Sequence, residues 1–284
     1  MQEISQVLLT QLTDLAHEAA NQATELIRDR RPSQLQVDHK STATDMVTNM
    51  DLASEALIRE VILSARPQDR FIGEESGAAD PATATGQKTD EPVVTWVVDP
   101  IDGTTNYLYD LPGYNISIAA EVAGETVVGV VADPAHGRIY SAAIGSGAFC
   151  DGTPLRVPNE AHHASSLDRA LIATGFGYSP DLRARQALVV AELIPRVRDI
   201  RRLGAAALDL CHVAAGRVDG YFEVNLGPWD LAAGALIARE AGAIVAHIDG
   251  GPPLPGSVVA ASPAIYDQLQ AILVELNAGS VLAP

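Results

Sequence analysis

Two acidic residues and a glycine follow a strongly apolar strand pattern near the middle of the chain. Residues 96–98 are apolar, two of them β-branched, and they run into Asp99 and a proline. Proline has no backbone N–H and interrupts a regular strand, so we expect the chain to bend there. A bend would let Asp99, Asp102 and the carbonyl of Ile101 face one centre, and oxygen ligands of these kinds bind hard divalent cations. The alternative is that Asp102 and Gly103 only form a turn, which both residue types favour for local reasons.

Further acids stand at predicted strand ends and helix starts. Glu74 and Glu75 follow a short strand pattern. Neighbours in an extended segment point in opposite directions, so we expect only one of them to enter a shared site. Asp51 and Asp230 each stand at the start of a predicted helix, where a carboxylate also commonly caps the first turn. Glu223 ends a short aromatic strand, a position where an exposed carboxylate often has no chemical role.

Taken together, these groups are the parts of a metal-dependent phosphoester hydrolase. The carboxylates could bind cations, and Gly103-Thr104-Thr105 supplies backbone N–H groups and hydroxyls suited to phosphate oxygens. The sequence contains no recognisable Ser–His–Asp or Cys–His arrangement and no Walker loop that would indicate a different chemistry.

The composition indicates a folded, acidic protein. Of 284 residues 47% are hydrophobic and 19% charged, and the net charge is −17. Such a charge argues against a nucleic-acid partner, and an anionic substrate would need bound cations to invert the local field. No signal peptide or membrane-spanning run is apparent, and Cys150 and Cys211 match no metal or redox spacing. We therefore expect a cytoplasmic protein with reduced thiols and no membrane partner.

The first half of the chain reads as helices followed by strands. Apolar residues, among them Leu52 and Ile58, recur at helical spacing and predict helices over residues 7–27 and 51–65. Polar loops are predicted at residues 33–44 and 78–91. Besides the central stretch, strands are predicted at residues 69–73, 115–122, 126–132, 138–144 and 148–150.

The second half alternates strands and helices after a polar connection at residues 155–166. Strands are predicted at residues 170–174, 220–223, 244–248 and 258–261. Helices are predicted at residues 181–197, 204–215, 229–241 and 263–276. The order indicates an α+β first half and an α/β second half around packed sheets. We predict an N-terminal domain, residues 1–155, that carries most candidate metal ligands, and a C-terminal domain, residues 156–284, that completes the site and the alcohol pocket.

Four segments carry a resemblance to a known family. They are DMVTNMD at residues 45–51, FIGEES at 71–76, WVVDPIDGTTN at 96–106 and WDLAAG at 229–234. In this order the chain resembles the inositol monophosphatase family of Mg²⁺-dependent, lithium-sensitive phosphatases, over residues 40–261. The resemblance implies a layered αβαβα sandwich of the inositol monophosphatase and fructose-1,6-bisphosphatase type, and a homodimer.

The resemblance also implies a role for each acid. Glu74, Asp99 and the carbonyl of Ile101 would hold a first Mg²⁺. Asp99, Asp102 and Asp230 would hold a second, which makes Asp99 a bridge. Glu74 with water would hold a weaker third ion.

The remaining implied roles concern water, phosphate and alcohol. Asp51 and Thr104 would orient and deprotonate the attacking water, with Glu74 in the same catalytic set. Lys40 and Glu75 match loop positions that organise metal or water indirectly. The implied substrate contacts are the backbone groups of Gly103 and Thr104 at the phosphate, with Asp230 beside them, and Ala206 and Glu223 at the alcohol. Ala205 departs from the many relatives that have Thr or Ser there, which leaves the contact at this helix start less defined.

The implied reaction is hydrolysis of myo-inositol 1-phosphate, or a similar polyol phosphate, to the alcohol and inorganic phosphate by metal-activated water. Relatives act on histidinol phosphate, fructose 1,6-bisphosphate or 3′-phosphoadenosine 5′-phosphate with the same metal set, so these stay open as substrates. Two other classes also stay open: an interaction partner of the transcription or translation machinery, and a cation-binding structural module.

Overall fold

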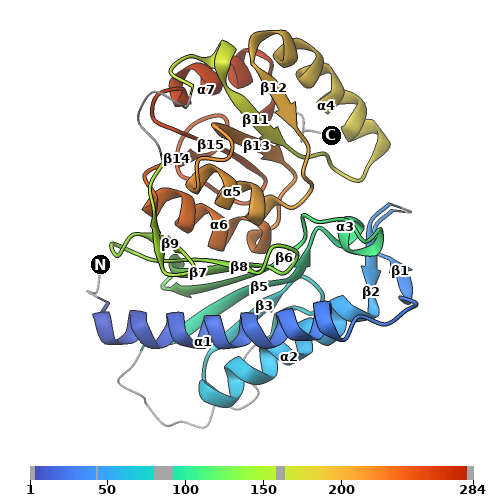
Figure 1. Ribbon diagram of the computed structural model, residues 1–284, viewed down its shortest axis with the longest axis vertical. Helices are drawn as coiled ribbons and strands as arrows, with labels where there is room; N and C mark the ends of the chain where they lie inside the picture. Colours follow the sequence, from blue (N-terminus) through green and yellow to red (C-terminus); the bar gives the residue numbers. More distant parts are fainter. Residues whose placement is uncertain (1–3, 43, 80–91, 158–163, 280–284) are drawn as a thin grey trace.

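The described residues form five alternating layers of helices and sheets. The computed structural model describes residues 4–42, 44–79, 92–157 and 164–279. In Figure 1 helices lie under a large sheet, further helices separate it from a smaller sheet, and others cover the far side of the smaller sheet. This arrangement confirms the predicted αβαβα sandwich.

The first helical layer consists of α1 (Gln6–Thr24) and α2 (Asn49–Ala65). Ser5 caps α1 by accepting a hydrogen bond from the Leu8 N–H at 3.2 Å. A π-helical turn, Glu25–Asp29, extends α1. Apolar side chains of both helices pack in one core with β5, β6 and β7 of the large sheet, which places α2 against the strand that carries the central acids.

The large sheet has eight strands in the order β10-β9-β8-β7-β6-β5-β3-β4. They are β3 (Arg70–Gly73), β4 (Gly77–Ala79), β5 (Val94–Asp102), β6 (Asn115–Val122), β7 (Glu125–Asp133), β8 (Arg138–Ala143), β9 (Ala148–Cys150) and β10 (Thr153–Leu155). Among the described strand pairs of this sheet, only β3–β5 is parallel. The β5–β6 register shifts between Asp99 and Asp102. The strand pairing is therefore irregular around Pro100, and the side chains there are redirected.

The middle layer consists of α5 (Ala206–Ala214) and α6 (Pro228–Glu240), which share a core with both sheets. Gly129 of β7 permits this packing, because a Cβ there would lie 2.8 Å from the carbonyl oxygen of Ala233 on α6. The smaller sheet has the order β12-β11-β13-β15-β14. Its strands are β11 (Leu171–Thr174), β12 (Asp199–Arg201), β13 (Gly220–Val224), β14 (Ile244–Ala246) and β15 (Ser257–Ala261).

The last layer is α4 (Pro180–Leu193) and α7 (Tyr266–Glu275). The predicted helix 181–197 was too long: α4 ends at Leu193 and a 3₁₀ turn, Ile194–Arg196, follows. Pro195 lies in that turn and cannot supply the N–H that a continuing helix needs.

Several short elements were not predicted. β1 (Val37–His39) and β2 (Met46–Thr48) pair in a separate two-stranded sheet, where residues 33–44 were expected to be a loop. The short helix α3 (Thr104–Leu108) follows β5, and β12 forms the edge of the smaller sheet. Most of the predicted loop 78–91 lies outside the described residues. Among the described helices none combines the length and the apolar character needed to cross a membrane. The division at residue 155 stays a prediction.

Candidate active site

Three carboxylates from two distant segments meet beside the end of β5. Asp99 and Asp102 lie on β5 and Asp230 lies in the first turn of α6, and each offers an oxygen within 4.8 Å of the others. Asp99 and Asp102 are 1% and 7% exposed, while Asp230 is partly exposed. Buried acids this close repel one another unless protons or a cation compensate them.

The pKa values of the three acids show that repulsion. Burial raises the pKa of Asp99 well above its usual value, and the charges of Glu74, Asp102 and Asp230 raise it further. Burial raises the pKa of Asp102 to about 6, although several hydrogen bonds act against the shift. Burial and the charge of Asp102 likewise raise the pKa of Asp230. Three close carboxylates that repel one another and offer only oxygen ligands fit a divalent cation such as Mg²⁺.

Backbone groups fix the orientation of each carboxylate. Asp102 accepts hydrogen bonds from the Asn115 side-chain amide at 2.8 Å and from the N–H groups of Ala206 and Ala207 at 3.2 and 2.9 Å. It therefore caps α5 and joins that helix to the large sheet. Asp99 accepts from the Ile101 N–H at 3.0 Å. Asp230 caps α6 by accepting from the Gly227 N–H at 2.7 Å, as its position at a helix start suggested.

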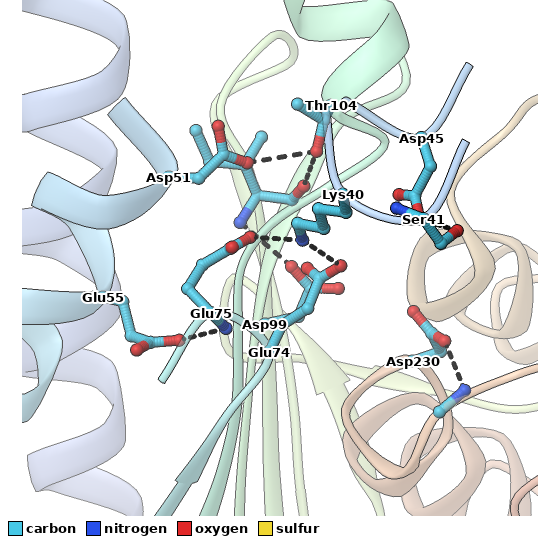
Figure 2. Close-up of polar contacts among 12 residues, drawn as sticks. Lys40, Ser41, Asp45, Asp51, Glu55, Glu74, Glu75, Asp99, Thr104 and Asp230 are labelled. Atoms are coloured by element: carbon cyan, nitrogen blue, oxygen red, sulfur yellow. Dashed lines mark hydrogen bonds and ion pairs between the residues drawn. The ribbon is translucent and has the colours of Figure 1, made fainter. Parts of the chain in front are cut away.

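Glu74 and Glu75 both turn towards one ammonium group (Figure 2). The Lys40 Nζ lies 2.8 Å from Oε1 of Glu74 and 2.6 Å from Oε1 of Glu75. The expectation that the two side chains point in opposite directions is wrong, because they lie in a turn between β3 and β4 and not in an extended strand. Burial lowers the pKa of Lys40, but the two carboxylates outweigh it, so the net pKa is raised. Burial raises the pKa of Glu75 to about 7.

Asp51 has both the capping role and a contact with Thr104. Its Oδ2 accepts from the N–H and the hydroxyl of Thr48 at 2.8 and 2.5 Å, a capping box at the start of α2. Its Oδ1 accepts from the Thr104 hydroxyl at 3.1 Å. Burial raises the pKa of Asp51 above its ordinary value. A buried carboxylate joined to a hydroxyl can receive a proton from it.

Gly103 turns the chain from β5 into α3. Its φ of 87° is left-handed, and a Cβ there would lie 2.8 Å from the carbonyl oxygen of Gly113. Only glycine meets both conditions without strain. The first N–H groups of the helix that follows have no acceptors within the helix and can bind an anion.

Glu223 lies on β13, within electrostatic reach of Asp102. The Tyr221 hydroxyl donates to its Oε2 at 2.8 Å, and burial raises the pKa of Glu223 to about 7. A Cβ on Gly175 would overlap the Glu223 carboxylate, so any larger residue there would displace it. The N–H of Ala206 is already bonded to Asp102, which leaves its methyl group for any substrate contact.

Sequence reasoning missed three residues that support the site: Glu55, Asn115 and Tyr221. Glu55 follows Asp51 by one helical turn, and that spacing could have placed it on the same face of α2. Tyr221 precedes Glu223 by two residues in a strand, so both side chains share a face. No sequence signal singled out Asn115, whose partner depends on the β5–β6 register.

Comparison with known proteins agrees with this geometry. The family model described as "Inositol monophosphatase family" matches residues 8–278. The chain is 44% identical to inositol-1-monophosphatase SuhB of Mycobacterium tuberculosis, with 94% of each chain covered. It is 40% identical to Nus factor SuhB of Escherichia coli K12, over 92% of this chain and 94% of that protein.

A solved structure shows the same fold. The crystal structure of the suhB protein of Bartonella henselae superposes with a TM-score of 0.82 and 35% identity, covering 92% of this chain and 98% of that one. The family match spans nearly the whole chain and includes all four segments that suggested it. The chain therefore belongs to the inositol monophosphatase family, and it is a phosphoric monoester hydrolase.

Proposed function

We propose that this phosphatase is Mg²⁺-dependent and hydrolyses myo-inositol 1-phosphate or a similar polyol phosphate. The observation that carries the proposal is the meeting of Asp99, Asp102 and Asp230 beside the Asp51–Thr104 pair, in a chain 44% identical to proteins named inositol-1-monophosphatase. Glu223, a carboxylate near these acids, supports a substrate rich in hydroxyl groups, because a carboxylate accepts hydrogen bonds from them.

We further propose that these acids hold two or three Mg²⁺ ions. Glu74, Asp99 and the carbonyl of Ile101 would hold one, and Asp99, Asp102 and Asp230 would hold another, with Glu74 and water at a third. When bound, Mg²⁺ would supply positive charge to phosphate oxygens and lower the pKa of water. It would also relieve the repulsion that raises the pKa values of Asp99 and Asp230.

The chain's own residues would then move the proton and hold the substrate. The Thr104 hydroxyl would donate its proton to Oδ1 of Asp51 and take one from the attacking water. Backbone N–H groups of Gly103 and Thr104 would hold phosphate oxygens at the start of α3. Glu223 and Ala206 would contact the alcohol, and Asp230 would lie on the leaving-group side.

A second candidate role comes from the name of the Escherichia coli relative, Nus factor SuhB. That name supports testing this chain as a protein partner of the transcription machinery, with or without hydrolysis. The complete set of acids favours the enzymatic role, since an interaction surface does not need buried, mutually repelling carboxylates. We also propose that the protein is a cytoplasmic homodimer and sensitive to lithium, as the family resemblance implies.

A substrate panel tests the proposal. Phosphate release would be measured at saturating Mg²⁺ from myo-inositol 1-phosphate, histidinol phosphate, fructose 1,6-bisphosphate and 3′-phosphoadenosine 5′-phosphate. We expect the highest kcat/KM for the inositol ester, and Glu223→Ala should lower it while leaving simple phosphate esters less affected. Preference for one of the other three esters would refute the substrate, and no turnover of any ester would refute the hydrolysis.

A further inference from the structure

Helix α2 directs a buried polar face at the acidic site. Asp51, Ser54 and Glu55 are 0%, 0% and 5% exposed, and their spacing places them on one side of the helix. Each holds a different part of the site. Asp51 accepts from Thr104, and the Ser54 hydroxyl donates to the carbonyl oxygen of Pro100 at 3.2 Å. Glu55 binds the turn that carries Glu74, and it has no part in the proposed chemistry.

Two backbone hydrogen bonds hold that turn. The Glu74 N–H donates to the carbonyl oxygen of Val98 at 3.1 Å, one residue before Asp99. The Glu75 N–H donates to Oε2 of Glu55 at 2.8 Å (Figure 2). One bond ties the turn to β5, and the other ties it to α2. Together they fix the backbone from which the Glu74 side chain extends towards Asp99.

Gly73 provides a second, independent sign that Glu55 is fitted to this place. A Cβ added at Gly73 would overlap the carboxyl group of Glu55, although the φ of Gly73 is one that any residue can adopt. The glycine is therefore explained by the close approach of Glu55 and not by the backbone conformation. Gly73, at the end of β3, therefore leaves room for the carboxyl group of Glu55 on α2.

We propose that Glu55 is a positioning residue that holds the β3–β4 turn so that Glu74 faces Asp99, and that it thereby sets the Mg²⁺ affinity of the site. The inference rests on Glu74 being a Mg²⁺ ligand in the proposed function. A charged acceptor makes a strong hydrogen bond to a backbone N–H. Loss of such supporting contacts behind metal ligands typically weakens metal binding by about 10–100-fold.

Isothermal titration calorimetry with Mg²⁺, on the full chain without substrate, tests the proposal. Glu55→Ala should weaken binding about 10–100-fold, because the Glu75 N–H loses its acceptor. Glu55→Gln keeps an oxygen acceptor and should stay within a factor of about three of wild type. Glu60→Ala removes an exposed glutamate from the same helix and should bind as wild type does.

Gly73→Ala gives the same test from the other side of the contact. Its added methyl group should displace Glu55 and weaken Mg²⁺ binding in the same direction. The double variant with Glu55→Ala should bind no more weakly than the weaker single variant, because both changes break one contact. At saturating Mg²⁺ the kcat of each variant should approach that of wild type, which a loss of general stability would not predict.

Each contrary outcome has its own meaning. Mg²⁺ binding by Glu55→Ala as tight as by Glu60→Ala would overturn the positioning role, even if its melting temperature fell. A loss in Glu55→Gln as large as in Glu55→Ala would show that the charge matters and not the hydrogen bond, and would also overturn it. If Glu55→Ala does not fold, Gly73→Ala and Glu55→Gln decide the question. Wild-type protein that binds no Mg²⁺ would refute the proposed function itself.

Discussion

The hydroxyl of Thr104 lies 3.1 Å from Oδ1 of Asp51 and 3.1 Å from the carbonyl oxygen of Ile101. Thr104 starts α3, Asp51 lies in the first turn of α2, and Ile101 is near the end of β5, so one side chain joins three elements. The hydroxyl has a single proton to share between two acceptors. That geometry suits a group that passes its proton to Asp51 when water attacks the substrate.

Thr104→Ala should therefore lower kcat by about 10²–10⁴, the range for loss of acid–base catalysis, and Asp51→Asn should act in the same direction. The KM and the calorimetric affinity for Mg²⁺ should change little, because neither residue is among the three clustered acids. Thr104→Ser keeps the hydroxyl and should retain much of the activity. A Thr104→Ala enzyme with near wild-type kcat would exclude this proton path.

In Asp99→Asn, Mg²⁺ should no longer raise the free energy of unfolding. In wild type, Mg²⁺ at about 100 times its Kd should add about 2.7 kcal/mol to the free energy of unfolding. Asp99→Asn removes one of the buried repelling charges, so in EDTA its melting temperature should equal or exceed that of wild type. Melting scans with EDTA and with Mg²⁺ measure both effects. If Mg²⁺ raised the melting temperature of the variant as much as that of wild type, the ligand role of Asp99 would be contradicted.

Acid should destabilise the protein through His212. This α5 side chain is 14% exposed, and burial followed by the charge of Arg217 lowers its pKa from 6.5 to about 4. Asp209, 4.0 Å away, offers little compensation, because burial raises its pKa well above the usual value. Between pH 6.5 and 4 the unfolded chain binds a proton at this position and the folded chain does not, so stability falls as pH falls.

The expected contribution is about 3 kcal/mol between these pH values. Urea unfolding of wild type and His212→Gln at several pH values, in saturating Mg²⁺, isolates it. The difference in unfolding free energy between the two proteins should change over this window and be constant above pH 7. A pH-independent difference would mean that His212 is not held neutral by the fold.

Asp69→Ala should lower the free energy of unfolding by about 3–5 kcal/mol, which is the cost of removing one partner from a buried ion pair. The Asp69 carboxylate is 2% exposed and accepts from the Trp96 Nε1 at 2.9 Å, from the Val94 N–H at 3.2 Å and from Arg66. Chemical denaturation measures the loss. The folded variant should keep the Mg²⁺ affinity of wild type, because these contacts lie at the other end of β5 from Asp99; a loss below 1 kcal/mol would refute the estimate.

Periodicity predicted the large elements but not which face of a helix is buried. The pattern placed Leu52 in the apolar set of α2, yet it is 56% exposed, while Asp51 and Glu55 beside it are buried. Their burial depends on donors from the β3–β4 turn and from α3, which no local pattern contains. β1 was missed because its three residues are all exposed and two of them are polar, so no apolar alternation marks them.

The clustering of Asp99, Asp102 and Asp230 could be anticipated from the sequence because these acids stand in local segments that resemble a family. The alternation argument failed for Glu74 and Glu75, because it was applied to residues that lie in a turn. It could not find Asn115, which reaches Asp102 only through strand pairing. Residues within a motif were predictable, whereas those that support it from other elements were not.

Anomalous diffraction from crystals grown with Mn²⁺ in place of Mg²⁺ tests the metal centre most directly. We predict a strong peak bounded by carboxylate oxygens of Asp99, Asp102 and Asp230, at roughly 2.1 Å from each ligand. The peak should disappear in Asp99→Asn crystals. Strong peaks only at other acids, with these three carboxylates free of metal, would contradict the proposed site.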